Sequence, residues 1–196
     1  MKKVLLLDSH LVADSVSYTH NILASIEQKV KAKGYDVTKY DLNETHGHTF
    51  LTSKNFPAYY QEIDSDKWIN LLKETDTLVI TMPMINFGPT AVVKNFIDSI
   101  SVANKTFSYK YSKKGDAIGF LTNLKVVIVA SQGAPEGWYT WGNHVSWLEG
   151  TFKFLGVKEV EVLRHFGTKV APLSETSPQD TPQLIEEKIN KIVESI

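Results

Sequence analysis

The sequence predicts an α/β fold in which five parallel strands form an open sheet with helices on both faces. Three observations support this class. Short apolar runs recur along the chain, stretches with helical spacing separate them, and the connections have the length of helical crossovers. Wholly apolar runs suit parallel strands that are buried on both faces. We expect the strands at Val4–Leu7, Val37–Tyr40, Thr77–Met82, Val126–Ala130 and Val160–Leu163.

The segments between the expected strands carry apolar residues at helical spacing. The first such stripe ends before Gly34, a suitable residue just past a helix C-terminus. Residues 41–63 and 104–119 lack a clear period and are expected to be irregular insertions, which in a compact domain are often functional. No repeat or linker is evident, so we expect a single domain over residues 1–196. The expected helices contain Ile22–Val30, Trp68–Leu72, Thr90–Ser101, Val145–Leu155, and a C-terminal stripe of Leu184, Ile185, Ile189 and Ile192.

The composition excludes several functional classes. The 21 basic and 22 acidic residues leave no surplus of positive charge for nucleic acid or an anionic membrane. Apolar runs such as Val126–Ala130 are too short to span a bilayer. Met1, Lys2 and Lys3 lead directly into the first strand without the apolar region of a signal peptide, so we expect a cytoplasmic protein. Because cysteine is absent, redox chemistry would require a borrowed cofactor.

Ligands of such sheets bind at the carboxyl ends of the strands, where the loops after strands one, three and four meet. The first loop offers Ser9, His10, Ser15 and Ser17 before a helix, whose free amides and dipole favour a phosphate. The same serines could simply cap that helix. Neither a dinucleotide glycine fingerprint nor a Walker lysine is present.

The other two loops offer a surface for a flat ring. In the second, Met84 and Phe87 are apolar, and Asn86 both donates and accepts hydrogen bonds. In the third, Gly133 allows a ligand to approach the backbone closely. The second loop alone is equally compatible with a rigid strand–helix connection, and the third alone is better explained as an ordinary strand–helix turn. Their coincidence at one edge of one sheet favours a ligand site.

The whole chain resembles the FMN-dependent NADH-azoreductases, a branch of the flavodoxin-like quinone reductases. The resemblance is carried by residues 82–88, 94–98, 105–107, 131–133 and 154–156. It implies a flavodoxin-like three-layer fold with strand order 2-1-3-4-5 and one FMN per subunit. It also implies ping-pong hydride transfer from NADH through FMN to quinones or aromatic azo compounds, and a homodimer with its sites at the interface.

The resemblance also implies a set of cofactor-binding residues. Departures from the family pattern occur at His10, where relatives often have serine, at Ile85, which replaces a frequent tyrosine, and at Ala134, which replaces a glycine. Tyr109 stands where the family can place an aromatic side chain over the partner's flavin. No catalytic side chain is assigned, because solvent can supply protons. The implied residues are Ser9, Ser15, Val16 and Ser17 for the phosphate, Met84, Ile85, Asn86 and Phe87 along the ring and ribityl chain, and Ser131, Gln132, Gly133 and Ala134 at the pyrimidine edge.

Two other functions remain open. An electron carrier like flavodoxin would bind FMN without a substrate of its own, although the long insertions better suit a substrate cavity. An acyl-carrier-protein phosphodiesterase would need a metal cluster or an activated nucleophile, and neither is evident. His46 and His48 lack a third ligand at a recognised spacing, so no metal site is expected.

Further aromatic and histidine residues are interpreted without a chemical role. Trp138, Tyr139 and Trp141 are expected to form a wall of the substrate slot near a subunit contact, and Trp147 to lie in the core. His144 and His165 are interpreted as packing or hydrogen-bonding residues rather than bases.

Overall fold

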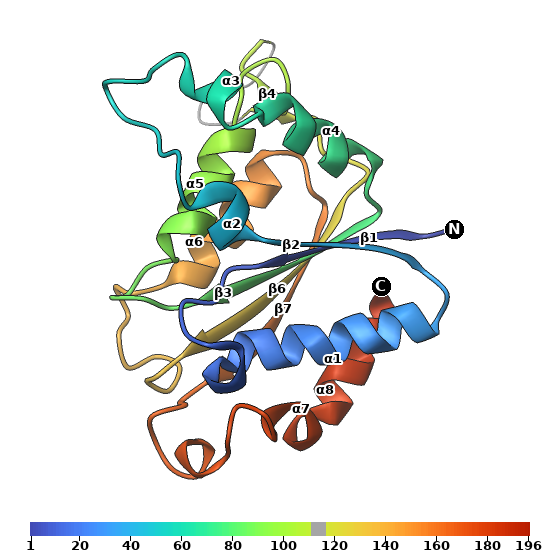
Figure 1. The fold of residues 1–196 in the computed structure, drawn as a ribbon, viewed down its shortest axis with the longest axis vertical. Coiled ribbons are helices and arrows are strands. Elements are labelled where there is room, and N and C mark those ends of the chain that lie inside the picture. Colours follow the sequence, from blue (N-terminus) through green and yellow to red (C-terminus); the bar gives the residue numbers. More distant parts are fainter. Residues whose placement is uncertain (111–116) are drawn as a thin grey trace.

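A computed structural model describes residues 1–110 and 117–196 and has the predicted α/β architecture (Figure 1). Five parallel strands form the sheet in the order β2-β1-β3-β6-β7, which confirms the predicted order 2-1-3-4-5. Each strand contains the run that predicted it. The strands are β1 (Lys3–Asp8), β2 (Asp36–Asp41), β3 (Thr77–Pro83), β6 (Lys125–Gln132) and β7 (Glu159–Phe166).

Helices cover both faces of the sheet (Figure 1). On one face α1 (Tyr18–Ala32) and α8 (Glu186–Ser195) pack against Val4 and Leu6 of β1. On the other, α4 (Ser65–Glu74), α5 (Ala91–Ile100) and α6 (His144–Phe154) pack against Leu5 and Leu7. Alternate β1 side chains therefore enter opposite cores, as expected for a strand that is buried on both faces.

Polar side chains cap the beginnings of α1 and α6. Ser17 accepts a hydrogen bond from His20 N at 3.2 Å at the start of α1, and Asn143 accepts one from Ser146 N at 3.0 Å at the start of α6. Gly34 follows α1 with φ of 77°, as predicted for a residue past the helix end. These caps set where each helix starts relative to the carboxyl edge of the sheet.

The expected irregular insertion at residues 41–63 is partly wrong, because it contains two short helices, α2 (Leu42–His46) and α3 (Tyr59–Glu62). The side chain of Asp41 accepts from Asn43 N at 2.7 Å and starts α2. Leu42 and His46 lie one turn apart and are both buried. A five-residue helix is too short to show a period, and its stability comes from this burial.

The expected C-terminal helix is also divided. It consists of α7 (Thr181–Leu184) and α8, with the break at Ile185. Leu184 is 55% exposed, so it does not belong to the apolar stripe that predicted a single helix. The stripe itself is real for Ile189 and Ile192, which are buried in α8.

The second expected insertion contains an antiparallel pair, β4 (Phe107–Ser108) and β5 (Ile118–Gly119), while residues 111–116 of it lie outside the described residues. Gly119 packs directly on another backbone segment, since a Cβ there would lie 2.1 Å from the nitrogen of Gly156. In the described part of the chain, no helix combines the length and the apolar character needed to cross a membrane.

Candidate functional site

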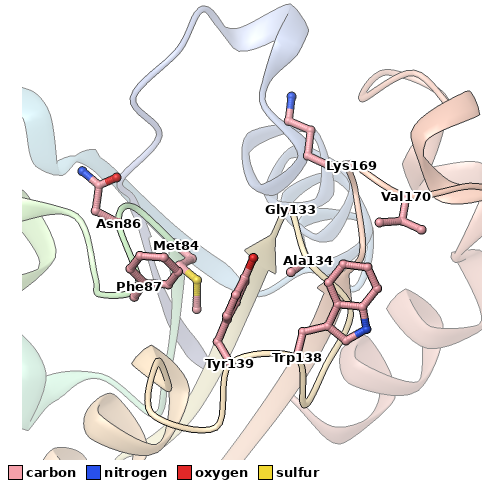
Figure 2. A pocket seen from close by; sticks show the side chains of 9 residues that line it. All are labelled: Met84, Asn86, Phe87, Gly133, Ala134, Trp138, Tyr139, Lys169 and Val170. Atoms are coloured by element: carbon pink, nitrogen blue, oxygen red, sulfur yellow. The ribbon is translucent and has the colours of Figure 1, made fainter.

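A cavity of about 450 Å³ opens at the carboxyl ends of β3 and β6 (Figure 2). This is the edge at which parallel α/β sheets bind ligands, and the volume lies within the usual range for small-molecule sites. Two loops face each other across it, one after each strand. The residues that line it are Met84, Asn86, Phe87, Gly133, Ala134, Trp138, Tyr139, Lys169 and Val170.

The first wall is a tight turn after β3. Ile85 N donates to Gly88 O and Gly88 N donates to Ile85 O, both at 3.0 Å. The two residues between them, Asn86 and Phe87, have φ values of 46° and 72°, as in a type I′ turn. Positive φ is uncommon for asparagine and strained for phenylalanine. The bond from Met84 N to Ser131 O, 2.8 Å long, fixes this strained turn to the end of β6.

Aromatic side chains extend this wall. The ring of Phe87 lies 5.1 Å from that of Tyr139 and 4.4 Å from that of Trp141, centroid to centroid. A Cβ at Gly142 would lie 3.0 Å from Phe87 Cβ, so the lack of a side chain there lets the two loops meet. In Figure 2, Tyr139 stands between Phe87 and Trp138. Phe87, Trp138, Tyr139 and Trp141 are 41%, 62%, 40% and 71% exposed, an apolar surface suited to a flat ring.

The second wall is the loop after β6. Gly133 O accepts from Lys169 N at 2.9 Å, and a Cβ at Gly133 would lie 2.9 Å from Lys169 Cγ. Gln132 Nε2 donates to Ala134 O at 3.0 Å and to Pro135 O at 3.2 Å. The side chain of Gln132 therefore holds the loop from behind, while Gly133 and Ala134 present backbone and little side chain to the cavity.

The sequence did not predict two lining residues, Lys169 and Val170, which follow β7. Among the described residues that line the cavity, Lys169 alone carries a charge. Figure 2 shows its side chain directed away from Trp138 and Tyr139. The predicted strand order could have identified these two residues, because the loop after the fifth strand lies beside the loop after the fourth.

The β1–α1 loop lies beyond this cavity, at the N-terminus of α1. Ser9 is fully buried, and its hydroxyl donates to Thr81 O at 2.6 Å while its N–H donates to Thr81 Oγ1 at 2.7 Å. Ser15 and Val16 are exposed in a 3₁₀ turn (Asp14–Val16), and Ser17 caps α1. Ser9 thus fastens the loop to β3, and the exposed residues near α1 form its outer surface.

Two carboxylates and two imidazoles gather at the same loop. His20 Nδ1 lies 2.6 Å from Asp8 Oδ2, and His10 Nδ1 lies 3.3 Å from Asp8 Oδ1. On their other sides, His10 Nε2 lies 3.1 Å from Asp14 Oδ1 and His20 Nε2 lies 3.7 Å from Asp14 Oδ2. The two rings are 5.0 Å apart in an edge-to-face arrangement. The sequence did not predict this cluster, because His20 comes from α1 and meets the loop residues only in the folded structure.

Three further histidines, His46, His144 and His165, are buried. Burial lowers the pKa of His144 to about 4, against weaker opposing hydrogen bonding from the backbone of Met82 and Ser131, and it also lowers the pKa of His165. Both are therefore neutral at physiological pH, which agrees with their interpretation as packing residues. His46 is buried between Trp68 and Phe96, whereas His48 is exposed, so the structure does not bring that pair together.

The structure thus gathers five of the twelve expected cofactor residues around one cavity, namely Met84, Asn86, Phe87, Gly133 and Ala134. Ile85, Ser131 and Gln132 shape the two walls without lining it, and Ser9, Ser15, Val16 and Ser17 belong to the β1–α1 loop.

Three comparisons place the chain among known proteins. A family model described as having a flavodoxin-like fold matches residues 2–193. The chain is 48% identical over 183 residues to an FMN-dependent NADH:quinone oxidoreductase of Mycoplasmopsis synoviae, covering 92% of each chain. It is 43% identical over 198 residues to a protein of the same name from Mycoplasma mycoides subsp. mycoides SC, covering 100% of this chain and 98% of that one.

A solved structure shares the fold. It is an FMN-dependent NADH-azoreductase from Bacillus anthracis in complex with FMN, with a TM-score of 0.76 and 19% identity, and the match covers 98% of this chain and 100% of that one. At this identity the likeness concerns the arrangement of strands and helices.

Proposed function

The chain belongs to the family with the flavodoxin-like fold, and from this membership we propose that it is an FMN-dependent NADH:quinone oxidoreductase. This is the function named for relatives that are similar to it over nearly their whole length, and it favours an enzyme over an electron carrier. The observation that carries the proposal is the cavity between the Met84–Phe87 turn and the Gly133–Ala134 backbone. The residues 1–196 would act as one flavin-binding domain.

The residues of the cavity fit a flavin. A flat ring needs apolar walls that are close together, and Phe87, Tyr139 and Trp138 provide aromatic surfaces. A polar ring edge needs backbone groups within reach, and Gly133, which carries no Cβ, allows that approach. We propose that the ring and ribityl chain lie against Met84 to Phe87, with Ser131 to Ala134 at the pyrimidine edge.

The phosphate of FMN would lie at the β1–α1 loop. Ser15, Val16 and Ser17 precede α1, whose first-turn N–H groups and dipole favour an anion. Ser9 supports this loop from below through Thr81. Its contribution to binding is therefore to fix the loop, not to contact the phosphate.

Bound FMN supplies hydride chemistry, and the chain supplies position and exclusion of water. The exposed aromatic side chains Trp138 and Tyr139 would hold NADH and then the quinone or azo acceptor in one slot in turn, which gives ping-pong kinetics. No described side chain in the cavity is required as an acid or base, and His144 is buried with its pKa lowered to about 4.

We further propose a cytoplasmic homodimer with the sites at the interface. The support is the exposed aromatic surface beside the cavity, which a second subunit would cover. Tyr109, which is 64% exposed and packs on Phe107, would contribute to the partner's site.

The deciding experiment is spectroscopic. The purified protein should be yellow, and anaerobic NADH should bleach it, with reoxidation by a quinone. A bound flavin that NADH fails to reduce would favour the electron carrier. A protein that takes up no FMN would contradict the proposal altogether.

A further inference from the structure

The β1–α1 loop lacks arginine and lysine, the usual positively charged partners of a phosphate. A phosphate dianion calls for positive charge, and it is most often met by arginine or lysine. Residues 9–17 contain neither. The ionisable side chains around the loop are Asp8 at the end of β1, His10 and Asp14 in the loop, and His20 in α1.

Asp8 holds both imidazoles from the inside. Its side chain is 1% exposed, and Oδ1 also accepts from Thr81 Oγ1 at 3.0 Å. A buried carboxylate is costly unless it has a positive partner and hydrogen bonds. His20 Nδ1, 2.6 Å from Oδ2, provides a charge-assisted hydrogen bond, and His10 Nδ1 provides an ion-pair contact at 3.3 Å. Asp8 therefore orients the ring of His20 through a hydrogen bond and lies within ion-pair distance of His10.

Asp14 faces the same rings from the outside. Its oxygens lie 3.1 Å from His10 Nε2 and 3.7 Å from His20 Nε2. A neutral imidazole has one donor and one acceptor nitrogen, whereas a carboxylate only accepts. Of the contacts between these rings and the two carboxylates, only that of His20 Nδ1 with Asp8 is a hydrogen bond, and His10 Nδ1 is buried without a hydrogen-bond partner. The Nε2 atoms face an acceptor on their outer side, which a phosphate oxygen can replace. Unlike Asp8, the side chain of Asp14 is 69% exposed, so it can leave the rings at little cost.

We infer that His10 and His20, held by Asp8, are the cationic part of the phosphate subsite. The carboxylate of Asp14 occupies the position of the phosphate when FMN is absent, and the phosphate displaces it when FMN binds. The inference rests on the proposed function. On this inference, the imidazole pair makes the protein bind FMN more tightly than riboflavin, since the two flavins differ only in the phosphate. The N-terminus of α1, capped by Ser17 three residues before His20, adds its dipole to the same place.

A divalent cation is the competing occupant. Asp8, His10 and His20 offer three ligand atoms within 4.8 Å of one another. However, the 2.6 Å separation of His20 Nδ1 and Asp8 Oδ2 is a hydrogen-bond length, which places a proton on the nitrogen that a metal would need bare. The geometry therefore favours an anion at Nε2 over a cation at Nδ1.

The test is a titration of the full-length protein, after removal of its flavin, with FMN and with riboflavin in the presence of EDTA, followed by flavin fluorescence. The variants are His10→Gln, His20→Gln and Asp14→Asn, with His48→Gln as a control at an exposed histidine outside the cluster. We expect each cluster histidine variant to weaken FMN binding by about tenfold or more, the size of a lost charge-assisted hydrogen bond. Asp14→Asn should tighten FMN binding. Riboflavin affinity should stay within about twofold in all four, since riboflavin lacks the charge that these residues address.

Several results would overturn the inference. Equal losses for FMN and riboflavin in the histidine variants would place their effect on the fold or on the ring cavity. Weaker FMN binding by Asp14→Asn would show that Asp14 supports the site and is not displaced. Loss of FMN affinity on adding EDTA to the parent protein would identify a cation. If His20→Gln does not fold because Asp8 loses its partner, the FMN affinity of Asp14→Asn still tests the inference, since Asp14 is exposed. A parent protein that binds neither flavin would instead refute the proposed function.

Discussion

At the carboxyl edge of the sheet, the cavity and the N-terminal end of α1 differ in the kinds of residues that form them. Around the cavity, the walls are a strained backbone turn, a glycine loop and exposed aromatic rings, and Lys169 is the single charged residue among the described lining. At the start of α1, four ionisable side chains meet within hydrogen-bonding and ion-pairing distance. We propose that one end selects the ligand by its shape and the other by its charge.

The contrast extends to the histidines of each end. Below the cavity, His144 is buried, and its pKa is lowered to about 4 because burial penalises the charged form. At the α1 end, His10 and His20 lie between carboxylates. The same residue type is thus buried and neutral at one end and faces two carboxylates at the other. Variants at the cavity should affect FMN and riboflavin alike, whereas the cluster variants should separate them.

The largest effect is expected from Gly133→Val. The added Cβ would lie 2.9 Å from Lys169 Cγ, and the branched side chain would fill the place where the backbone meets a ligand. We expect FMN and riboflavin affinity to fall by more than about tenfold, measured by fluorescence titration. Gly150→Val is the matched control, because a Cβ at Gly150 meets nothing within 4 Å. Near-parental binding of both flavins by Gly133→Val would mean that the loop does not face the ring.

Asn86 offers a sharper test of the strained turn. Asn86→Ala removes the amide and places alanine at φ of 46°, which should cost about 1 kcal/mol of stability and weaken both flavins. Asn86→Gly removes the same amide without the strain. Thermal unfolding and flavin titration of the pair therefore separate the side chain from the backbone. If neither variant changes flavin affinity or the rate of reduction, Asn86 does not belong to the site.

Lys169→Met should have a moderate effect that again treats the two flavins alike. Removing the one charged lining residue should make the reduced flavin less favourable. We expect the midpoint potential to fall by about 30 mV, which for two electrons is about 1.4 kcal/mol. Spectroelectrochemical titration measures this, and Lys169→Arg should keep the parental potential. A loss of FMN affinity without a loss for riboflavin would instead assign Lys169 to the phosphate end.

The smallest effect concerns acid stability. The folded-state pKa of His144, about 4, lies below its ordinary value of 6.5, so the unfolded chain takes up the proton first. The stability that this neutral histidine supports is fully present above pH 6.5 and is lost as the pH falls toward 4. In His144→Asn, the fall in melting temperature between pH 7 and pH 4.5 should be smaller than in the parent protein. An unchanged fall would exclude His144 as a source of the acid sensitivity.

Much of the fold could be predicted because local patterns and burial agree. Val126–Ala130 is apolar throughout and forms the interior of β6, where it lies between β3 and β7. The short helices were missed for the opposite reason. In α2, stability comes from the packing of Leu42 and His46 against distant elements, including a contact of His46 with Ser99, and no local period records it.

The site divides in the same way. Met84, Asn86, Phe87 and Gly133 were singled out in two loops at the ends of apolar strands, the family resemblance added Ala134, and the structure gathers all five. Ser9 was expected to bind the phosphate like the other serines of its loop, yet its hydroxyl donates a hydrogen bond to Thr81 O. Lys169 was not predicted as a lining residue, because a lysine next to Gly167 and Thr168 after a strand is typical of an ordinary surface loop.

By itself the sequence determined the α/β class, the strands and the edge at which we expect a ligand, because strand burial and loop composition can be recognised from short stretches of sequence. Only the tertiary structure decided which polar side chains remain available there. Asp8, His10 and Asp14 lie within seven residues of one another, and His20 joins them only when α1 packs back on the sheet. The charge cluster depends on contacts of 2.6 to 3.7 Å, and the order of residues alone does not encode those distances.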